Sequence, residues 1–331
     1  MCKMKGDDFL KAVVYHEQGN PDVLTTEEVD KPEIQPDEVL IQVKAVGLNP
    51  VDTYFRSGKR PVSSFPAIPH FDAAGIVEKV GSSAGNFQPG DRVWGTNIPS
   101  AAAEWAAAPA SNIFPLPKGM SFTEGASLGI PALTAHMALF FRAALQPEET
   151  VLIYGGAGAV GHAAIQLAKH HNAFVITTAS STEKHEAARR AGADVVLNLK
   201  DESWKKDFAS ATGQPGADVI VDMSFSENAD TDLQILSPGG RIVAVGSPVN
   251  NMPSFPWQLL NKKYASILGI LLFTAPVPAL QEAAFGVQRA YEKGVFSPHV
   301  ARTYPMEEAA QAHKDLENKR YSGNLVLTVS E

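Results

Sequence analysis

Short apolar runs separated by glycine, proline and polar residues fill the first third of the chain. Residues 39–46 are rich in β-branched side chains and partly alternate with polar ones, which is typical of a half-buried strand. Several similar runs at close spacing favour a barrel-like β domain. The runs that we interpret as its strands are residues 11–15, 39–46, 75–81, 91–95, 104–108 and 112–116.

A different pattern begins near residue 150. Near-continuous apolar runs alternate there with segments of helical length, which is the pattern of buried parallel strands and their crossover helices. We therefore predict a doubly wound parallel sheet. Its expected strands are residues 151–154, 174–178, 194–197, 218–222, 241–246 and 265–270. A strand that returns to the first domain is expected at residues 325–329, after a helix at 305–317.

A glycine-rich turn joins the first of these strands to a helix. Gly155, Gly158 and Gly161 follow the strand at three-residue spacing, and residues 162–169 have a helix-forming composition. One glycine permits a tight turn, one lets backbone N–H groups approach a pyrophosphate, and one lets the helix pack on the strand. The helix N-terminus adds unpaired N–H donors and a positive dipole end. This context favours dinucleotide binding over a plain turn.

Composition limits the remaining choices. The 331 residues exceed the usual size of a single core, so we expect two domains. A formal net charge of -8 disfavours nucleic acid and anionic membranes as partners. The one cysteine, Cys2, allows neither a disulfide framework nor a thiolate zinc cluster. Residues 1–8 lack the apolar core of a signal peptide, and residues 265–280 are interrupted by prolines, so we expect a cytoplasmic protein without a membrane span.

Several motifs together carry a family resemblance. The segment Asn-Pro-Val-Asp-Thr-Tyr-Phe-Arg-Ser-Gly at residues 49–58 resembles the zinc-free quinone oxidoreductase branch, which includes zeta-crystallin, of the medium-chain dehydrogenase/reductase superfamily. Residues 69–81, 90–93 and 131–135 and the glycine loop match the superfamily in the same order. The resemblance implies a GroES-like β-barrel-type catalytic domain at residues 1–125, completed by 295–331. A Rossmann NADPH-binding domain at 126–294 is implied with it.

The positions of the family's catalytic zinc are altered. Relatives with zinc carry a cysteine where this chain has Asn49, and their ligand histidine aligns with Phe71 rather than with His70. We therefore expect no zinc, and we interpret His70 as a structural or pocket-wall residue. Without a Lewis acid, an alkoxide is hard to stabilise. Conjugated acceptors such as quinones and enones, which spread the incoming charge over their own π-system, become the favoured substrates.

The choice of nicotinamide cofactor rests on the second strand of the sheet. NAD-binding proteins usually place an acid about 20 residues after the glycines. Here the strand Phe174–Thr178 is followed by Ala-Ser-Ser-Thr-Glu-Lys, with no acid at its end. Ser181 and Lys184 suit a 2′-phosphate, which favours cations and O–H donors, and they match the family's phosphate positions. We predict NADPH.

The resemblance assigns the remaining site residues. Asn49 and Tyr54 match residues that line the nicotinamide and substrate pocket, and Thr134 matches a nicotinamide contact. Gly246 with Ser247, and Leu272 with Phe273, follow strands at the switch point where ligands bind. For Phe273 the alternative interpretation is ordinary core. The loop residues that we assign to the cofactor are Gly155, Gly156, Ala157, Gly158, Ala159 and Val160.

The resulting hypothesis is NADPH-dependent reduction of a quinone in a cleft between the two domains. Tyr54 is its candidate catalytic residue, as a hydrogen-bond donor to the acceptor oxygen or only as a pocket wall. An enoyl, alkenal or haloacrylate reductase is an alternative enzyme. A lens structural or RNA-binding role is the alternative outside enzymes. In this superfamily the last strand often pairs across a dimer axis, so residues 266–272 suggest a homodimer or homotetramer, with a monomer that keeps this strand as an edge as the alternative.

Overall fold

In a computed structural model, the chain divides into two units. The structure describes residues 9–213, 216–246 and 252–329. The first unit contains Met1–Pro131 and Pro298–Glu331, and the second contains Ala132–Ser297. The predicted fold class, a mixed α/β chain with a β-rich domain and a doubly wound parallel sheet, is confirmed.

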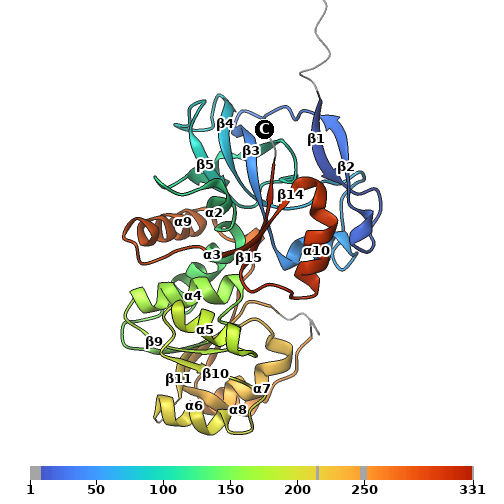
Figure 1. Cartoon of the computed structure of the whole chain (residues 1–331). Coiled ribbons are helices and arrows are strands. Elements are labelled where there is room, and N and C mark those ends of the chain that lie inside the picture. The colour runs from blue at the N-terminus through green and yellow to red at the C-terminus, as the bar shows by residue number, and fades with distance from the viewer. Residues whose placement is uncertain (1–8, 214–215, 247–251, 330–331) are drawn as a thin grey trace, which may run out of the picture. The chain divides into compact units, whose positions relative to one another are not determined.

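The first unit is built mainly from two sheets. Strands β1 and β2 pair antiparallel in a two-stranded sheet. The larger sheet has the order β14-β15-β3-β4-β5-β7, and β6 also pairs with β3. The C-terminal strand β15 pairs antiparallel with β3, so strands from the two ends of the sequence lie side by side in this unit (Figure 1). Its strands are β1 (Phe9–Val14), β2 (Thr25–Asp30), β3 (Glu38–Leu48), β4 (Asp72–Val80), β5 (Arg92–Gly95), β6 (Trp105–Pro109), β7 (Ile113–Pro115), β14 (Val300–Pro305) and β15 (Asn324–Thr328).

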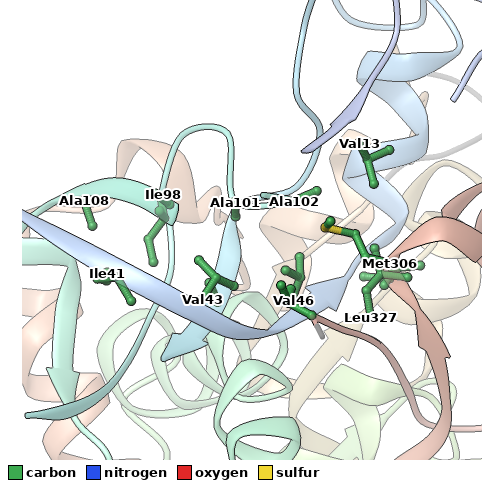
Figure 2. Close-up of a cluster of buried hydrophobic side chains, with 14 of the residues drawn as sticks. Val13, Ile41, Val43, Val46, Ile98, Ala101, Ala102, Ala108, Met306 and Leu327 are labelled. Carbon is green, nitrogen blue, oxygen red and sulfur yellow. The ribbon is translucent and has the colours of Figure 1, made fainter. Parts of the chain in front are cut away.

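Alternating side chains of these strands form the core of the first unit. Ile41, Val43 and Val46 on β3 point into one cluster with Leu327 from β15 (Figure 2). Met306, from a short turn after β14, joins them. The core therefore ties the C-terminal segment to the N-terminal strands. The helices of this unit are α1 (Pro50–Arg56), α2 (Phe122–Ala126) and α10 (Ala309–Glu317).

The second unit is a six-stranded parallel sheet of order β10-β9-β8-β11-β12-β13. Because all six strands run the same way, their carboxyl ends lie along one edge. The strands are β8 (Thr150–Ile153), β9 (Phe174–Thr178), β10 (Val195–Leu197), β11 (Ala217–Asp222), β12 (Leu236–Ala244) and β13 (Ser266–Gly269). The helices are α4 (Ala159–His170), α5 (Thr182–Arg190), α6 (Trp204–Thr212), α7 (Phe225–Ile235), α8 (Trp257–Lys262) and α9 (Val277–Glu292). Helix α3 (Gly129–His136) begins at the end of the first unit.

Candidate functional site

The glycine loop lies at the carboxyl edge of the parallel sheet. Strand β8 ends at Ile153, and the N–H of Tyr154 still donates to Val221 of β11 at 3.1 Å. Gly155 then adopts a φ of +69°, which favours glycine because other residues meet steric strain there. Gly158 is the N-cap of α4, so only five residues, 154–158, separate the strand from the helix. The predicted strand–turn–helix unit is therefore present.

Two glycines of this turn are required by close packing. A Cβ on Gly156 would lie 2.3 Å from the Thr177 hydroxyl oxygen, and a Cβ on Gly161 would lie 2.3 Å from the carbonyl oxygen of Gly155. A Cβ on Gly158 would lie 3.3 Å from that carbonyl oxygen, a much milder contact. Gly161 is thus the glycine that brings α4 close to the loop, as its predicted role requires.

The first turn of α4 offers backbone donors. The N–H of His162 makes the first bond within the helix, to the carbonyl of Gly158 at 2.8 Å. The N–H groups of Ala159, Val160 and Gly161 precede this bond, at the positive end of the helix dipole. Such a helix end suits the phosphates of a dinucleotide.

Ser181 and Lys184 lie together at the N-terminus of α5. Ser181 is the N-cap of that helix, and its hydroxyl oxygen accepts from the Lys184 N–H at 3.4 Å. Strand β9 leads to them and ends at Thr178, whose hydroxyl oxygen accepts from the Gly155 N–H at 3.0 Å. The β9 end is thereby tied to the glycine loop. The nearest acid along the chain, Glu183, is exposed in the first turn of α5.

The other predicted cofactor residues of the second unit follow β12 and β13. Gly246 comes two residues after β12, and its carbonyl accepts from the Phe225 N–H at 2.9 Å. Leu272 and Phe273 lie in a short turn after β13, the first buried and the second half-buried. Thr134 lies buried on α3 rather than at a strand end. Ser247 falls outside the described residues.

Asn49 and Tyr54 belong to the first unit, on or next to α1. Asn49 is the N-cap of this helix, and its backbone N–H donates to the Asp52 carboxylate at 2.7 Å. Tyr54, in the middle of α1, is half-buried, and the Lys59 ammonium lies 5.3 Å from its ring centroid. Asn49 is buried, and its side-chain amide donates to Asp72 at 2.7 Å.

Asp72 is a buried site residue that the sequence did not indicate. Besides Asn49, it accepts the Thr96 hydroxyl at 2.7 Å and the Ile130 N–H at 2.7 Å. Burial raises the pKa of the Asp72 carboxyl to about 7, while these three hydrogen bonds act in the opposite direction. Asp72 begins β4. In the sequence, only its place next to Phe71, which aligns with the zinc-ligand histidine of relatives, could have indicated a role for it.

His70 is committed to a chain of buried side chains. Its Nδ1 lies 2.9 Å from the Asp52 carboxylate, and its Nε2 lies 3.2 Å from Nε2 of His313 on α10. His70 and His313 are fully buried, and burial holds the pKa of His313 well below its usual range. One hydrogen lies between the two Nε2 atoms, because two lone pairs would repel.

Comparisons with known proteins cover most of the chain. The alcohol dehydrogenase GroES-like domain model matches residues 35–118, and the zinc-binding dehydrogenase model matches residues 159–285. A quinone oxidoreductase from Rattus norvegicus is 37% identical over 94% of this chain and 95% of its own length. A 2-haloacrylate reductase from a Burkholderia species is 30% identical over 96% of this chain and 99% of its own. A mycobacterial protein solved with NADPH has a TM-score of 0.88 and 32% identity, covering 96% of this chain and 99% of that one.

The name of the second family model implies zinc, and the residues present do not fit that metal. Zinc takes Cys, His or carboxylate ligands held as a set. Asn49 donates its amide to Asp72, and both ring nitrogens of His70 have partners. Across residues 9–213, 216–246 and 252–329, no group of three or more His, Cys, Asp or Glu side chains is arranged to hold a metal ion.

Hydropathy gives one further result. Within the described parts of the chain, no helix is both long and apolar enough to cross a membrane.

Three findings indicate the same family. They are the match to the GroES-like domain model, the six-stranded parallel sheet, and relatives such as the Rattus norvegicus quinone oxidoreductase, which aligns over nearly the full length at 37% identity. The chain therefore belongs to the medium-chain dehydrogenase/reductase superfamily, among the quinone oxidoreductases that resemble zeta-crystallin.

Proposed function

We propose that the protein is a zinc-independent, NADPH-dependent oxidoreductase that reduces quinones or similar conjugated carbonyl acceptors. The observation that carries this proposal is the β8–glycine loop–α4 unit, in a chain whose near-full-length relatives include quinone oxidoreductases. Residues 1–125 with 295–331 as the catalytic domain, and 126–294 as the cofactor domain, remain predicted boundaries. NADPH, when bound, supplies the hydride, and the protein supplies orientation and electrostatics.

The preference for NADPH rests on the start of α5. A 2′-phosphate beside this helix end would be bound by the Ser181 hydroxyl, the Lys184 ammonium and the N-terminus of α5. Lys184→Ala should weaken NADPH binding roughly tenfold or more, because hydrogen bonds to charged groups contribute about 1.5–3 kcal/mol. NADH binding should change little. Arg190→Ala, at the other end of the same helix, is the matched control with the same loss of charge. Titration by cofactor fluorescence would decide, and equal losses for both cofactors would refute the assignment.

Tyr54 is the proposed donor to the acceptor oxygen. A phenolic O–H placed there stabilises the charge that develops during hydride transfer. Tyr54→Phe keeps the ring and removes only the donor, so kcat should fall by about tenfold or more while the KM for NADPH holds. An unchanged kcat would leave Tyr54 as a pocket wall.

A second activity has support of its own, since one near-full-length relative is a 2-haloacrylate reductase. Both reactions deliver hydride to a conjugated acceptor. A substrate panel of 1,2- and 1,4-quinones, enones, enoyl thioesters and haloacrylates, each with NADPH, would separate them by kcat/KM. A preference for haloacrylates or enoyl thioesters over every quinone would replace the first proposal by the second.

We also propose that the protein is a homodimer or homotetramer. Strand β13 is the last strand of the parallel sheet, and its residues are half-buried or exposed. An apolar edge of this kind readily pairs with another strand. Light scattering after size exclusion should give a multiple of the 35.4 kDa chain mass. Ile267→Lys, which places a charge on β13, should reduce that mass to the monomer if the edge pairs.

A further inference from the structure

The parallel sheet of the second unit buries a pair of aspartates that the proposed mechanism does not use. Asp222 ends β11, and Asp232 lies on α7. Both are fully buried, and their side chains face each other within hydrogen-bonding reach. We call Asp222 and Asp232 the carboxyl pair.

The carboxyl pair is short of hydrogen-bond donors. One oxygen of Asp222 accepts from the Ser224 N–H at 2.7 Å and from the Asn228 amide at 3.0 Å, and one oxygen of Asp232 accepts from the Tyr154 hydroxyl at 2.7 Å. Among the described residues, the Oδ2 atoms of both aspartates have no donor. Two ionised carboxylates would leave both oxygens buried and unsatisfied, next to a like charge. A single hydrogen between them satisfies both.

The surroundings decide which aspartate holds the hydrogen. Asp222 receives two N–H donors, which favour its charged form, whereas Asp232 receives one hydroxyl. Burial, followed by the charge of Asp222, raises the pKa of Asp232 to about 9. Burial also raises the pKa of Asp222, and Glu227 adds to that rise. Asp232 is therefore the protonated member.

The carboxyl pair joins two segments of the cofactor site. Tyr154, which donates to Asp232, directly precedes Gly155. On the other side, the backbone carbonyl of Asp222 accepts from Val245 at 2.8 Å, and Phe225 donates to the carbonyl of Gly246 at 2.9 Å. The residue before the glycine loop is thus bonded to the carboxyl pair directly, and residues 245 and 246 are bonded to the backbone of Asp222 and Phe225.

We propose that Asp232 is a positioning residue, which shares a proton with Asp222 and thereby holds the glycine loop and the Gly246 segment in place for the dinucleotide. This inference rests on the proposed NADPH binding. It reaches the cofactor only through Tyr154 and the backbone around Gly246, because neither carboxyl is exposed. The pair acts as a fixed hydrogen-bond link and performs no chemistry.

Three variants separate the hydrogen bonds from the charge. Asp232→Asn provides an N–H in place of the shared proton and an oxygen for Tyr154, so its NADPH Kd should stay within about threefold of the wild type. Asp232→Leu leaves the Tyr154 hydroxyl and an oxygen of Asp222 unpaired and should raise the Kd roughly tenfold or more. Tyr154→Phe removes only the link to the glycine loop and should give an intermediate rise. Asp230→Asn, on the exposed side of α7, is the control.

Two readouts test the shared proton directly. Infrared spectra of the protein labelled with ¹³C at its aspartates should show a protonated carboxyl in the wild type at pH 8, where Asp72 is mostly ionised, and that signal should be largely lost in Asp232→Asn. The melting temperature of the wild type should fall between pH 7 and pH 10 more than that of Asp232→Asn, because only the wild type loses this proton.

The possible failures are distinct. Absence at pH 8 of a carboxyl signal that depends on Asp232 would overturn the shared proton, and an Asp232→Asn variant as damaged as Asp232→Leu would overturn the hydrogen-bond link. If Asp232→Leu does not fold, the comparison of Asp232→Asn with Tyr154→Phe retains the test: equal Kd values would overturn the positioning role. A wild type that binds no NADPH would refute the proposed function, while the infrared signal would still report on the carboxyl pair.

Discussion

Asp72 in the first unit and the carboxyl pair in the second are both closed off from solvent, but they differ in their supply of donors. Asp72 has three, from Asn49, Thr96 and the Ile130 backbone, shared between its two oxygens. The carboxyl pair also has three, but four oxygens to satisfy, and two of them stay without a donor in the described structure. The same residue type is therefore held by protein donors in one place and by a proton in the other.

The difference in the number of donors changes the carboxyl pKa values, and it shows how hydrogen bonds offset the cost of burying a charged carboxylate. Burial raises the pKa of Asp72 to about 7 and that of Asp232 to about 9. Hydrogen bonds from N–H and O–H groups stabilise the ionised form of Asp72, whereas the neighbouring Asp222 destabilises the ionised form of Asp232. A buried carboxyl with enough donors can stay charged near neutrality, and one that faces another carboxyl cannot.

The largest effect should come from deleting the acceptor in the donor-rich network. Asp72→Leu leaves three buried donors unpaired, and each costs about 1–3 kcal/mol. We expect a loss of roughly 3–9 kcal/mol in the free energy of unfolding, measured by urea denaturation. Asp37→Leu, at an exposed site of the same unit, should change the free energy by less than about 0.5 kcal/mol. A loss below about 1 kcal/mol for Asp72→Leu would show that the donors find water instead.

The pH dependence of stability should separate the two regions. Both folded-state pKa values lie above the ordinary 3.8 of an aspartate, so each folded site holds a proton that the unfolded chain releases. Stability is then fully present below about pH 4 and is lost as pH rises, through about 7 for Asp72 and about 9 for Asp232, at about 1.4 kcal/mol per pH unit and proton.

Denaturation of the wild type and of Asp232→Asn, repeated between pH 7 and pH 9, measures this window. The wild type should lose more stability over that range, because only the wild type releases the Asp232 proton there, whereas Asp72 titrates in both proteins near pH 7. The Asp230→Asn variant, at an exposed position of α7, is the control, and its curve should keep the slope of the wild type. Parallel curves for the wild type and Asp232→Asn would contradict the assignment of the higher pKa to the carboxyl pair.

The pattern of apolar residues was sufficient to predict most strands of the two sheets that carry Asp72 and the carboxyl pair. Strand Phe174–Thr178 has its predicted bounds, because a continuous β-branched run between polar turns leaves few alternatives. Strand β2 was missed because Thr25–Asp30 carries only one apolar residue and pairs only with β1. Helix α1 was not predicted as a helix, since seven residues show little periodicity.

The buried carboxyl groups could not be predicted in the same way. Periodicity tells which apolar side chains share a face, but Asp72 and Asp222 are polar residues at the ends of apolar strands, where exposed acids are also common. The partner Asp232 lies on the next helix, and its contact with Tyr154 joins residues 78 positions apart. Site residues such as Tyr54, Ser181 and Lys184 came from family motifs, and their roles remain predictions.

A smaller effect is expected from removing one donor of Asp72. Thr96→Val preserves the shape of the side chain and deletes its hydroxyl, so the free energy of unfolding should fall by about 1 kcal/mol. The loss of a donor should also raise the pKa of Asp72 further, because the ionised form loses support. Thr96→Ser retains the hydroxyl and is the matched control. Equal stabilities of the two variants would show that Thr96 contributes packing only.

The smallest effect should come from the corresponding change beside the carboxyl pair. Asn228→Ala removes one of the two donors to Asp222, but alanine favours the helix more than asparagine does, so the free energy of unfolding should fall by only about 0.5 kcal/mol. With less support for the charge of Asp222, the pair should hold its proton to a higher pH, and the alkaline loss of stability should move upward. Gln234→Ala removes an exposed hydrogen bond on the same helix and should do neither. An alkaline midpoint that moves downward in Asn228→Ala would contradict the view that donors to Asp222 compete with the shared proton.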